Sequence, residues 1–552
     1  MGMVRDMPPA TRRWFPLLVV LAALAASVTS LGNRFALDDL PIVLQNGRVH
    51  SLSTPWAWLV QTYWPPEHGA ALYRPLVIFG FALQWITGQG SPLVFHLVSV
   101  LLYAAASLAV FWLARQLLPD GAALIAGLYF AVQPVHVEAV GNVVGQSELI
   151  VGLLLALGVG VYVRERGAGA VTVRAGVALT GLYLLALMAK EHALVFPALL
   201  VLAELLLVEH AVDLRTRFEK LIPLYLALGT VAISFWTVRT MVTGGTVGRD
   251  WHPAFRTGGF ALRLWTSLGV MPEYVRLLLF PAHLSADYNP QAIPVATSAG
   301  PRQLLGIGVL LLLAVVVAWA WRRRPLVAFG VLWCALALFP VSNLLLPTGI
   351  LLAERTLFLP SIGVALALGG AATLLLPRWD GWAPATRRLI VVALGVLALA
   401  GVARSAIRQP VWKDNATLFE QTALDAPTSY RARAARAVLW IENGREAEGE
   451  QEYRAALDLY RDDPNLFADF GNYYVRKARY AEALVLYQRV LELVPDHWSA
   501  TSRSILCLIQ LGRLDEARRL AQVATHRGDE GAAAKLAFVD SLLAHRPDST
   551  RH

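Results

Sequence analysis

The stretch that decides the fold is QLLGIGVLLLLAVVVAWAW, residues 303–321, which carries no charge and is followed at once by Arg322, Arg323 and Arg324. At about 1.5 Å per residue, a helix of this length crosses roughly 30 Å of hydrocarbon. An uncharged block with a cluster of arginines at one end is typical of a membrane-spanning helix and its cytoplasmic flank.

Comparable apolar blocks fill most of residues 14–406 and are separated by short polar joints. The chain of 552 residues is 56% hydrophobic and only 16% charged, a composition that excludes an ordinary soluble globule. Basic residues precede the first block as in a signal peptide, but because many blocks follow, we interpret this block as a retained helix. The sequence predicts a polytopic, all-α membrane domain over 1–406 with about eleven spans, at 14–31, 92–114, 121–138, 145–163, 173–189, 192–209, 221–239, 303–321, 325–343, 351–376 and 387–405.

Arginine and lysine residues gather in alternate joints between these blocks. The basic joints contain Arg5, Arg12 and Arg13; Arg115; Arg164, Arg166 and Arg174; Arg215, Arg217 and Lys220; Arg322, Arg323 and Arg324; and Arg378, Arg387 and Arg388. By the positive-inside rule these joints are cytoplasmic, and so is the N-terminus. The membrane thus explains the net charge of +9 without a nucleic acid. An odd number of spans places the C-terminal tail on the opposite, non-cytoplasmic side of the membrane.

Two long loops, 32–91 and 240–302, are expected on that same outer side. Each holds a semi-apolar stretch, 73–87 and 258–280, that is short or interrupted by charges. We interpret both stretches as interfacial helices on the outer leaflet, because adding either one as a span would invert everything downstream.

The last part of the chain, residues 407–552, repeats a helical pattern with a fixed period. Gly444, Ala478 and Gly512 are spaced 34 residues apart, and each precedes an arginine. This is the period of the tetratricopeptide repeat, a helix–turn–helix unit that stacks into a solenoid. The same phase gives small residues at Gly449, Ala483 and Ala517 and recurring core residues at Trp440, Tyr474 and Leu508.

We therefore predict three repeats with proline-marked turns at Pro464 and Pro495, preceded by a helix at 412–426 and capped by one at 531–546. Arrays of this kind bind many sorts of peptide, so the pattern is informative about the fold rather than about a ligand. The repeats either engage a protein partner or only brace the membrane domain.

Ionisable residues that border the apolar blocks collect on the predicted outer side. Such residues are costly in a membrane unless they face a polar cavity, so their shared side points to a functional site. They are Asp38, Asp39, His136, Glu138, Glu148, Lys190, Glu191, His192, Glu354 and Arg355.

Carboxylates beside basic groups suit the transfer of a group from an anionic leaving group. Asp38, or its neighbour Asp39, is the candidate general base for the proton of an attacking hydroxyl. Lys190 and Arg355 are candidates for holding the phosphate of a lipid-linked donor. His136 and Glu138 are candidates for orienting hydroxyls or for binding a divalent cation, although no fixed ligand spacing defines a metal site.

Each of these assignments has a structural alternative. Asp38 and Asp39 also fit a solvated loop. The pairs Lys190–Glu191 and Glu354–Arg355 also fit ion pairs at helix ends. His136 alone is more often a hydrogen-bonded packing residue than a ligand.

Several short motifs, in this order and ahead of a repeat tail, are similar to those of one known family. The motifs are Phe35–Asp39, Tyr73–Leu76, Phe95–Val98, Gln133–Ala139, Ala189–Glu191, Leu284–Tyr288, Phe339–Asn343, Ala353–Arg355 and Leu359–Ser361. Over nearly its whole length the chain resembles the transmembrane and tetratricopeptide-repeat protein O-mannosyltransferases and their bacterial relatives. The resemblance implies a bacterial inner-membrane protein whose repeat domain is periplasmic.

The resemblance implies a GT-C fold and a glycosyltransferase that takes a sugar from a polyprenyl phosphate and inverts its anomeric carbon. Its catalytic carboxylate would lie in the first outer loop, at Asp38 or Asp39. The motifs add Arg74 as a phosphate-binding candidate. They add Glu191, Glu354, Asp287 and Tyr288 as candidates that orient substrate. The sugar would be mannose or another hexose, and the acceptor a protein serine or threonine that the repeats engage.

The sequence leaves three functions open. These are glycosylation of exported proteins, glycosylation of a lipid or cell-surface polysaccharide, and a non-catalytic envelope scaffold that binds proteins through its repeats. A transporter is disfavoured because the charged groups lie near one surface rather than at mid-membrane.

Overall fold

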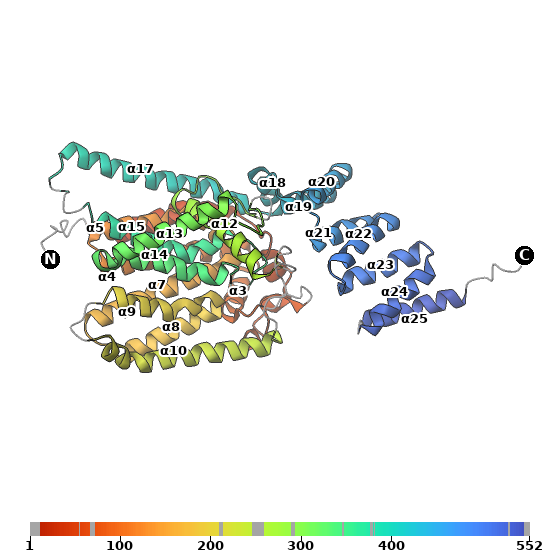
Figure 1. Ribbon diagram of the computed structural model, residues 1–552, viewed down its shortest axis with the longest axis horizontal. Coiled ribbons are helices and arrows are strands. Elements are labelled where there is room, and N and C mark those ends of the chain that lie inside the picture. Colours follow the sequence, from red (N-terminus) through yellow and green to blue (C-terminus); the bar gives the residue numbers. More distant parts are fainter. Residues whose placement is uncertain are drawn as a thin grey trace, which may run out of the picture. The chain divides into compact units, whose positions relative to one another are not determined.

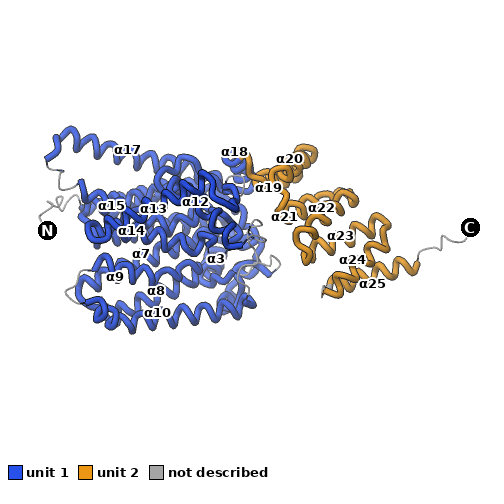
Figure 2. The backbone as a smooth tube through the Cα atoms, in the orientation of Figure 1, with its two compact units in different colours: residues 1–426 blue, residues 427–552 orange. Residues whose placement is uncertain are grey.

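The computed structural model describes residues 12–54, 56–66, 72–208, 213–245, 255, 259–288, 293–344, 347–375, 379, 381–527 and 530–545. These residues form helices and connecting turns, and no strand occurs among them, which confirms the all-α class. The chain divides into two compact units, residues 1–426 and 427–552 (Figure 2). Arg5 and Arg378 of the predicted basic joints lie outside the described residues.

The first unit consists of helices at all of the expected apolar blocks (Figure 1). They are α2 (Phe15–Ser27), α4 (Pro92–Leu117), α5 (Asp120–Ala131), α6 (Val137–Gly141), α7 (Gln146–Gly167), α8 (Val173–Ala189), α9 (Phe196–Leu206), α10 (Leu214–Thr243), α13 (Pro301–Arg323), α14 (Pro325–Leu338), α15 (Phe358–Ala372) and α17 (Pro384–Arg408). In the described parts of the long loops lie the α-helices α3 (Pro75–Gly88) and α12 (Phe260–Leu279). The last helix of this unit is α18 (Asn415–Asp425). It lies after the predicted domain boundary at residue 407 but inside the first compact unit, which ends at residue 426.

Seven of the described helices are long and apolar enough to cross a membrane, and an eighth span results if α5 and its bent continuation count as one. This continuation begins at Pro134 and departs from the axis of α5 by 43°. Proline lacks the N–H that an unbroken helix needs, which accounts for the bend. The chain is thus a multi-pass membrane protein. The expected total of eleven spans stays a prediction, because α8 and α14 are shorter apolar helices and α9 has only 11 residues.

The centre and the rim of the membrane unit differ in burial. In the span Val143–Gly167, which contains α7, 72% of the most apolar 18-residue stretch is buried inside the protein. In the span Pro384–Trp412, which contains α17, only 6% of the corresponding stretch is buried. Helix α7 packs against α4 and α8, and α14 packs closely against α15. At that crossing a Cβ on Gly330 would lie 2.3 Å from the carbonyl oxygen of Gly363, so only glycine permits the approach. The helices with exposed apolar faces are the ones suited to contact lipid.

A buried ionic network joins three helices at the arginine-rich end of the unit. Glu204 of α9 has no solvent exposure. It accepts hydrogen bonds from Tyr162 Oη at 2.6 Å, from Arg166 Nη2 at 2.7 Å and from Arg217 Nε at 3.0 Å. Arg166 Nε donates a further bond at 2.9 Å, so both carboxylate oxygens are saturated. We refer to this network as the Glu204 lock, since it ties the end of α7 and the start of α10 to α9.

The second unit has the predicted helix pairs. They are α19 (Tyr430–Glu442) with α20 (Glu446–Leu459), α21 (Pro464–Arg476) with α22 (Tyr480–Leu493), and α23 (Trp498–Gln510) with α24 (Leu514–His526), followed by α25 (Glu530–Ala544). The turn inside each pair contains one residue with positive φ, namely Gly444, Ala478 or Gly512. Pro464 begins α21, and Pro495 lies in the turn between α22 and α23.

The recurring core of the repeats is confirmed at two of three positions. Tyr474 and Leu508 are buried, as are the small residues that allow close crossing. Trp440 is only half-buried. The guanidinium groups of Arg445 and Arg436 stack on its ring at 4.2 Å and 4.9 Å and shield it from solvent instead.

Candidate functional site

The predicted site residues lie at helix ends opposite the Glu204 lock. Glu148 is in the first turn of α7, whose last turn holds Arg166. Lys190 caps the C-terminus of α8, and Glu191 begins the short 3-10 helix η8 (Glu191–Val195) that leads into α9. Arg355 lies in η10 (Glu354–Leu357), just before α15. Because consecutive helices run in opposite directions, these distant parts of the sequence converge.

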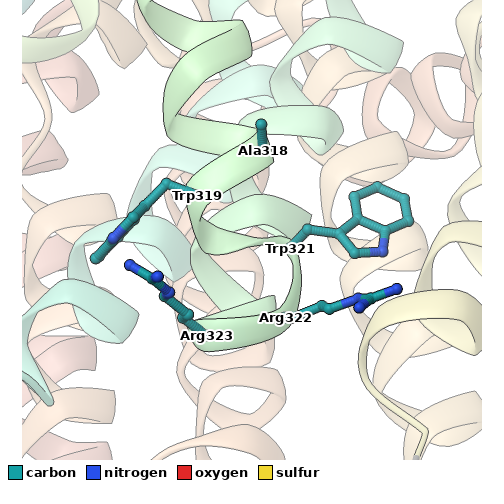
Figure 3. A pocket seen from close by; sticks show the side chains of 5 residues that line it. All are labelled: Ala318, Trp319, Trp321, Arg322 and Arg323. Atoms are coloured by element: carbon teal, nitrogen blue, oxygen red, sulfur yellow. The ribbon is translucent and has the colours of Figure 1, made fainter.

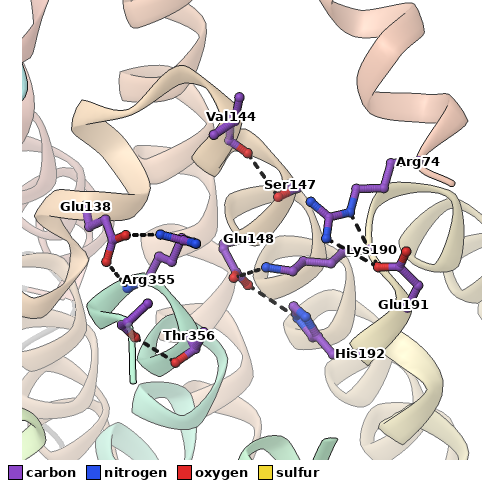
Figure 4. Close-up of polar contacts among 11 residues, drawn as sticks. Arg74, Glu138, Val144, Ser147, Glu148, Lys190, Glu191, His192, Arg355 and Thr356 are labelled. Atoms are coloured by element: carbon purple, nitrogen blue, oxygen red, sulfur yellow. Dashed lines mark hydrogen bonds and ion pairs between the residues drawn. The ribbon is translucent and has the colours of Figure 1, made fainter. Parts of the chain in front are cut away.

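These side chains form three ion-paired sets, Arg355 with Glu138, Lys190 and His192 with Glu148, and Arg74 with Glu191, which are near enough for their charges to interact (Figure 4). Lys190 Nζ contacts Glu148 Oε1, and His192 Nε2 lies 3.5 Å from the other oxygen of Glu148. The guanidinium of Arg355 contacts Glu138, which also accepts a 2.9 Å hydrogen bond from the Arg355 backbone N–H. We refer to the following residues as the charged cluster: Arg74, Glu138, Glu148, Lys190, Glu191, His192 and Arg355.

Arg74, at the start of α3, connects the first long loop to this cluster. Its Nε lies 3.4 Å from Glu191 Oε2, and its guanidinium stacks on the ring of Tyr63 at 4.9 Å. Burial raises the pKa of Glu191, but Arg74, the backbone N–H of Glu191 itself, Arg239 and Lys190 together outweigh this effect and hold that pKa below its ordinary value. The carboxylate is therefore ionised and sits among cations.

Asp38 lies beside the cluster and is only partly buried. Burial raises the pKa of its carboxyl above the ordinary 3.8, while Arg355 opposes the rise, Glu138 adds to it and Arg74 opposes it. Among the described residues, no donor lies within hydrogen-bonding distance of this carboxylate. Asp38 is thus near two arginines but bonded to neither.

Asp39 has a different environment from its neighbour. Its side chain has no solvent exposure. It accepts backbone N–H bonds from Val144 at 2.9 Å, from Val143 at 3.2 Å and from Ala36 at 3.3 Å. These bonds fasten the first outer loop to the turn before α7. These contacts fit the structural alternative for Asp39, and Asp38 is the more exposed carboxylate of the pair.

His136 is enclosed rather than exposed to a substrate. Its Nδ1 lies 3.1 Å from Tyr103 Oη and its Nε2 lies 2.8 Å from Ser361 Oγ. The rings of Phe130 and Phe358 are each 4.6 Å from the imidazole. Both ring nitrogens are occupied and the side chain is 1% exposed, so its surroundings fit the packing alternative.

Glu354, Tyr288 and Asp287 form a separate group. Tyr288 Oη donates to Glu354 Oε1 at 2.6 Å, and the Ser285 backbone N–H donates to the same oxygen at 2.7 Å. The Asp287 backbone N–H and carbonyl both bond the Ser285 hydroxyl. Glu354 is 3% exposed, so these bonds fix the loop before residue 289 against the entry to α15. The structure does not connect this group to the charged cluster by a hydrogen bond among the described residues.

Arg239 is a neighbour of the cluster that sequence reasoning missed. It lies near the end of α10, is 5% exposed, and stacks on Trp236 at 4.9 Å. Its charge acts on Glu191, as the lowered pKa of that residue records. The available signal was an arginine at the outer end of an apolar block, where the positive-inside rule disfavours one.

No group of three or more His, Cys, Asp and Glu side chains suited to a metal ion occurs in the described part of the chain. The cluster carboxylates instead face cations. Glu138 is paired with Arg355, and Glu148 with Lys190.

Two shallow hollows lie away from these residues. One, of about 430 Å³, lies at the arginine-rich end of α13 between Trp319, Trp321, Arg322 and Arg323 (Figure 3). Tryptophan beside arginine is the composition expected where a helix leaves the membrane. The other, of about 400 Å³, is mainly apolar and lies among α2, α4 and α7. Neither hollow contains a residue of the charged cluster.

Comparison with known proteins gives similarity over most of the chain. A tetratricopeptide-repeat family model matches residues 474–538. The protein O-mannosyl-transferase TMTC3 of Homo sapiens is 25% identical over 521 residues, which are 87% of this chain and 55% of that protein. The protein O-mannosyl-transferase F38B6.6 of Caenorhabditis elegans is 23% identical, over 80% of this chain and 62% of its own.

A third relative is more similar over a shorter range. The protein O-mannosyl-transferase Tmtc2 of Drosophila melanogaster is 33% identical over 316 residues, which are 54% of this chain and 33% of that protein. The chain spans about half the length of the curated relatives it matches. This chain is a homologue of the TMTC-type protein O-mannosyl-transferases, and it contains tetratricopeptide repeats.

Proposed function

We propose that the membrane unit transfers a hexose, with mannose as first candidate, from a polyprenyl phosphate to a serine or threonine hydroxyl of a protein. The names of the relatives supply the sugar and the class of acceptor. The reaction takes place at the outer end of the helices, on the non-cytoplasmic face of a multi-pass membrane protein.

The observation that carries this proposal is the position of Asp38. Its carboxylate has no hydrogen-bond partner among the described residues, yet Arg355 and Arg74 are near enough to act on its charge. Asp39 has no solvent exposure and its oxygens already accept three backbone N–H bonds, so an acceptor hydroxyl has no access to it, whereas the partly exposed Asp38 can accept a proton. Nearby cations supply the complementary function for an anionic leaving group.

The proposed step balances as a single displacement. The acceptor hydroxyl oxygen attacks the anomeric carbon while its proton passes to Asp38. The bond between the anomeric carbon and the phosphate oxygen breaks, and its electron pair leaves with the polyprenyl phosphate. Attack opposite the leaving group inverts the anomeric configuration.

The charge on the leaving phosphate increases by one unit in this step, so cations that face it stabilise the transition state. Arg355, Arg74 and Lys190 are the candidates. The Arg355 side chain is 25% exposed, against 13% for each of the other two, which makes it the most accessible of the three. Its bond to Glu138 holds the guanidinium in place without covering it.

The tetratricopeptide unit is proposed to engage the protein acceptor. Such solenoids present extended surfaces to peptide segments. The predicted topology places this unit on the same side of the membrane as the charged cluster, in a bacterial inner membrane.

The test is a transfer assay with the full chain in lipid nanodiscs. Hexosyl polyprenyl phosphates and a serine/threonine-rich peptide are supplied, and the product is identified by mass spectrometry and by the configuration of its anomeric carbon. The proposal expects an inverted O-linked hexose that is lost in Asp38→Asn and retained in Glu219→Gln, an exposed control of the same chemistry. If the hexose is found only on a lipid or a polysaccharide, that class of molecule replaces protein as the proposed acceptor. If transfer is undiminished in Asp38→Asn, Asp38 is not the general base.

A further inference from the structure

We propose that Glu191 and Arg239 form a hydroxyl-binding subsite that recognises the hexose ring of the donor. This inference rests on the proposed function and adds a specificity element to the same site. It requires that Arg239 faces Glu191, that atoms of both residues are left unpaired, and that a neutral hydroxyl is the group that suits them.

Helix α10 directs Arg239 towards the segment that carries Arg74. Phe235 precedes Arg239 by four residues and therefore lies on the same face of the helix. The Phe235 ring packs against Tyr73 at 5.6 Å, and both rings are buried. Tyr73 is the neighbour of Arg74, which bonds Glu191. The side of α10 that holds Arg239 thus faces the Arg74–Glu191 pair.

A hydrogen-bond donor and an acceptor are left unpaired at this place. Nε of Arg239 and Oε1 of Glu191 are both buried and have no hydrogen-bond partner among the described residues. The bonds of Arg74 to Glu191 go to the other oxygen, Oε2, and both are 3.4 Å long. Buried polar atoms of charged groups are rarely left unpaired, because the loss of solvation is then uncompensated.

The two unpaired atoms define the chemistry of their ligand. A hydroxyl accepts from an arginine N–H and donates to a carboxylate at the same time. A phosphate would suit Arg239 but be repelled by Glu191, and an ammonium group would have the opposite difficulty. A neutral polyol is therefore the matching class of ligand. The acceptor contributes its single reacting hydroxyl to Asp38, so the hexose of the donor is the group with hydroxyls left to read.

The test measures donor binding in an Asp38→Asn background, where turnover does not interfere. Hexosyl polyprenyl phosphate, its monodeoxy analogues and bare polyprenyl phosphate are titrated against the full chain in nanodiscs. We expect one deoxy analogue to bind about 10- to 100-fold more weakly than the intact sugar, as a charge-assisted hydrogen bond implies. Arg239→Gln and Glu191→Gln should weaken the intact donor by a similar factor, and should not weaken that analogue further.

The outcomes separate the subsite from the reaction. Arg215→Gln, an exposed arginine at the other end of α10, is the matched control and should bind all donors as the parent does. If the penalty of Arg239→Gln is equal for every analogue, or if bare polyprenyl phosphate binds as tightly as the hexosyl donor, the subsite is refuted even when transfer occurs. Arg239→Lys, which keeps the charge but loses Nε, serves where Arg239→Gln does not fold. If the binding differences hold but the parent chain with Asp38 intact transfers no hexose in the peptide assay, the proposed function is refuted and the subsite is not.

Discussion

Glu204 and Glu191 are carboxylates that face arginines of the same helix, one at each end of α10. Glu204 accepts bonds from two arginines and a tyrosine, and both of its oxygens are saturated. Glu191 has long contacts to one arginine through one oxygen, while its second oxygen is buried and unpaired. The saturated carboxylate of Glu204 has no oxygen left for a ligand, whereas the unpaired oxygen of Glu191 can accept a further hydrogen bond. The degree of pairing, rather than the presence of charge, distinguishes the structural end of the membrane unit from the candidate site.

The largest expected effect is on transfer in Asp38→Asn. Amide replacement keeps the shape and removes the base, so kcat should fall by about 10²- to 10⁴-fold. Because Asp38 bonds no donor among the described residues, the thermal stability should change little. Kinetics and thermal unfolding of the same preparation check this prediction. A large loss of stability with unchanged kcat would place Asp38 with the structural carboxylates.

Glu204→Gln should show the opposite behaviour. Removing the charge from a buried, fully paired network leaves Arg166 and Arg217 uncompensated and should destabilise the fold by about 3–5 kcal/mol. The kcat of the molecules that remain folded should match the parent. Unfolding in mixed micelles measures the loss, with Glu219→Gln, an exposed ion pair on α10, as the near-neutral control. A fall in kcat without a fall in stability would contradict the structural role of the lock.

The pH dependence of transfer should report the environment of Asp38. Burial raises the pKa of this carboxyl above the ordinary 3.8, with Arg355 opposing and Glu138 adding to the rise. The base acts only when ionised, so activity rises with pH up to the raised pKa and falls about tenfold per unit below it. The acid limb of kcat/KM should therefore lie above pH 3.8. An acid limb at or below that value would mean that the acting base is not buried.

The smallest effect concerns a turn outside both carboxylate groups. Ala478 has φ of 56° where Gly444 and Gly512 occupy the equivalent turns. A side chain in the left-handed region is strained, so Ala478→Gly should stabilise the repeats by about 1 kcal/mol and Gly444→Ala should do the reverse. Hydrogen-exchange protection of α21 and α22 in the full chain measures the change. An unchanged or lower protection in Ala478→Gly would show that the turn is not strained.

The sequence predicted the repeat unit well because its signal is local. The 34-residue spacing places the glycines, prolines and small residues directly in turns and crossings. Lys190, Glu191, Glu138 and Arg355 were also predictable as site candidates, since charge at the end of an apolar block needs a polar environment.

The pairing within the site could not be predicted in the same way. Asp38 and Asp39 are adjacent and chemically identical, and only the position of the Val143–Val144 backbone shows which of them is saturated. His136 is enclosed by aromatic residues from distant helices, which spacing does not reveal. Arg239 was missed because it is the last residue of the predicted span 221–239, where a single charge resembles the end of an apolar block rather than part of a site. The number of spans could not be predicted either, because α8 and α14 are close to the shortest length with which a helix crosses the hydrocarbon layer.

The most direct test of the account is the sidedness of α10, whose two ends carry the lock and the candidate site. Single cysteines at Arg215 and Met241, both highly exposed, are introduced into a chain in which Cys334 and Cys507 are replaced, and sealed cells are treated with a membrane-impermeant maleimide. The account predicts labelling of Met241→Cys in intact cells and of Arg215→Cys only after the membrane is opened. Labelling of both from one side, or in the reverse order, would contradict it.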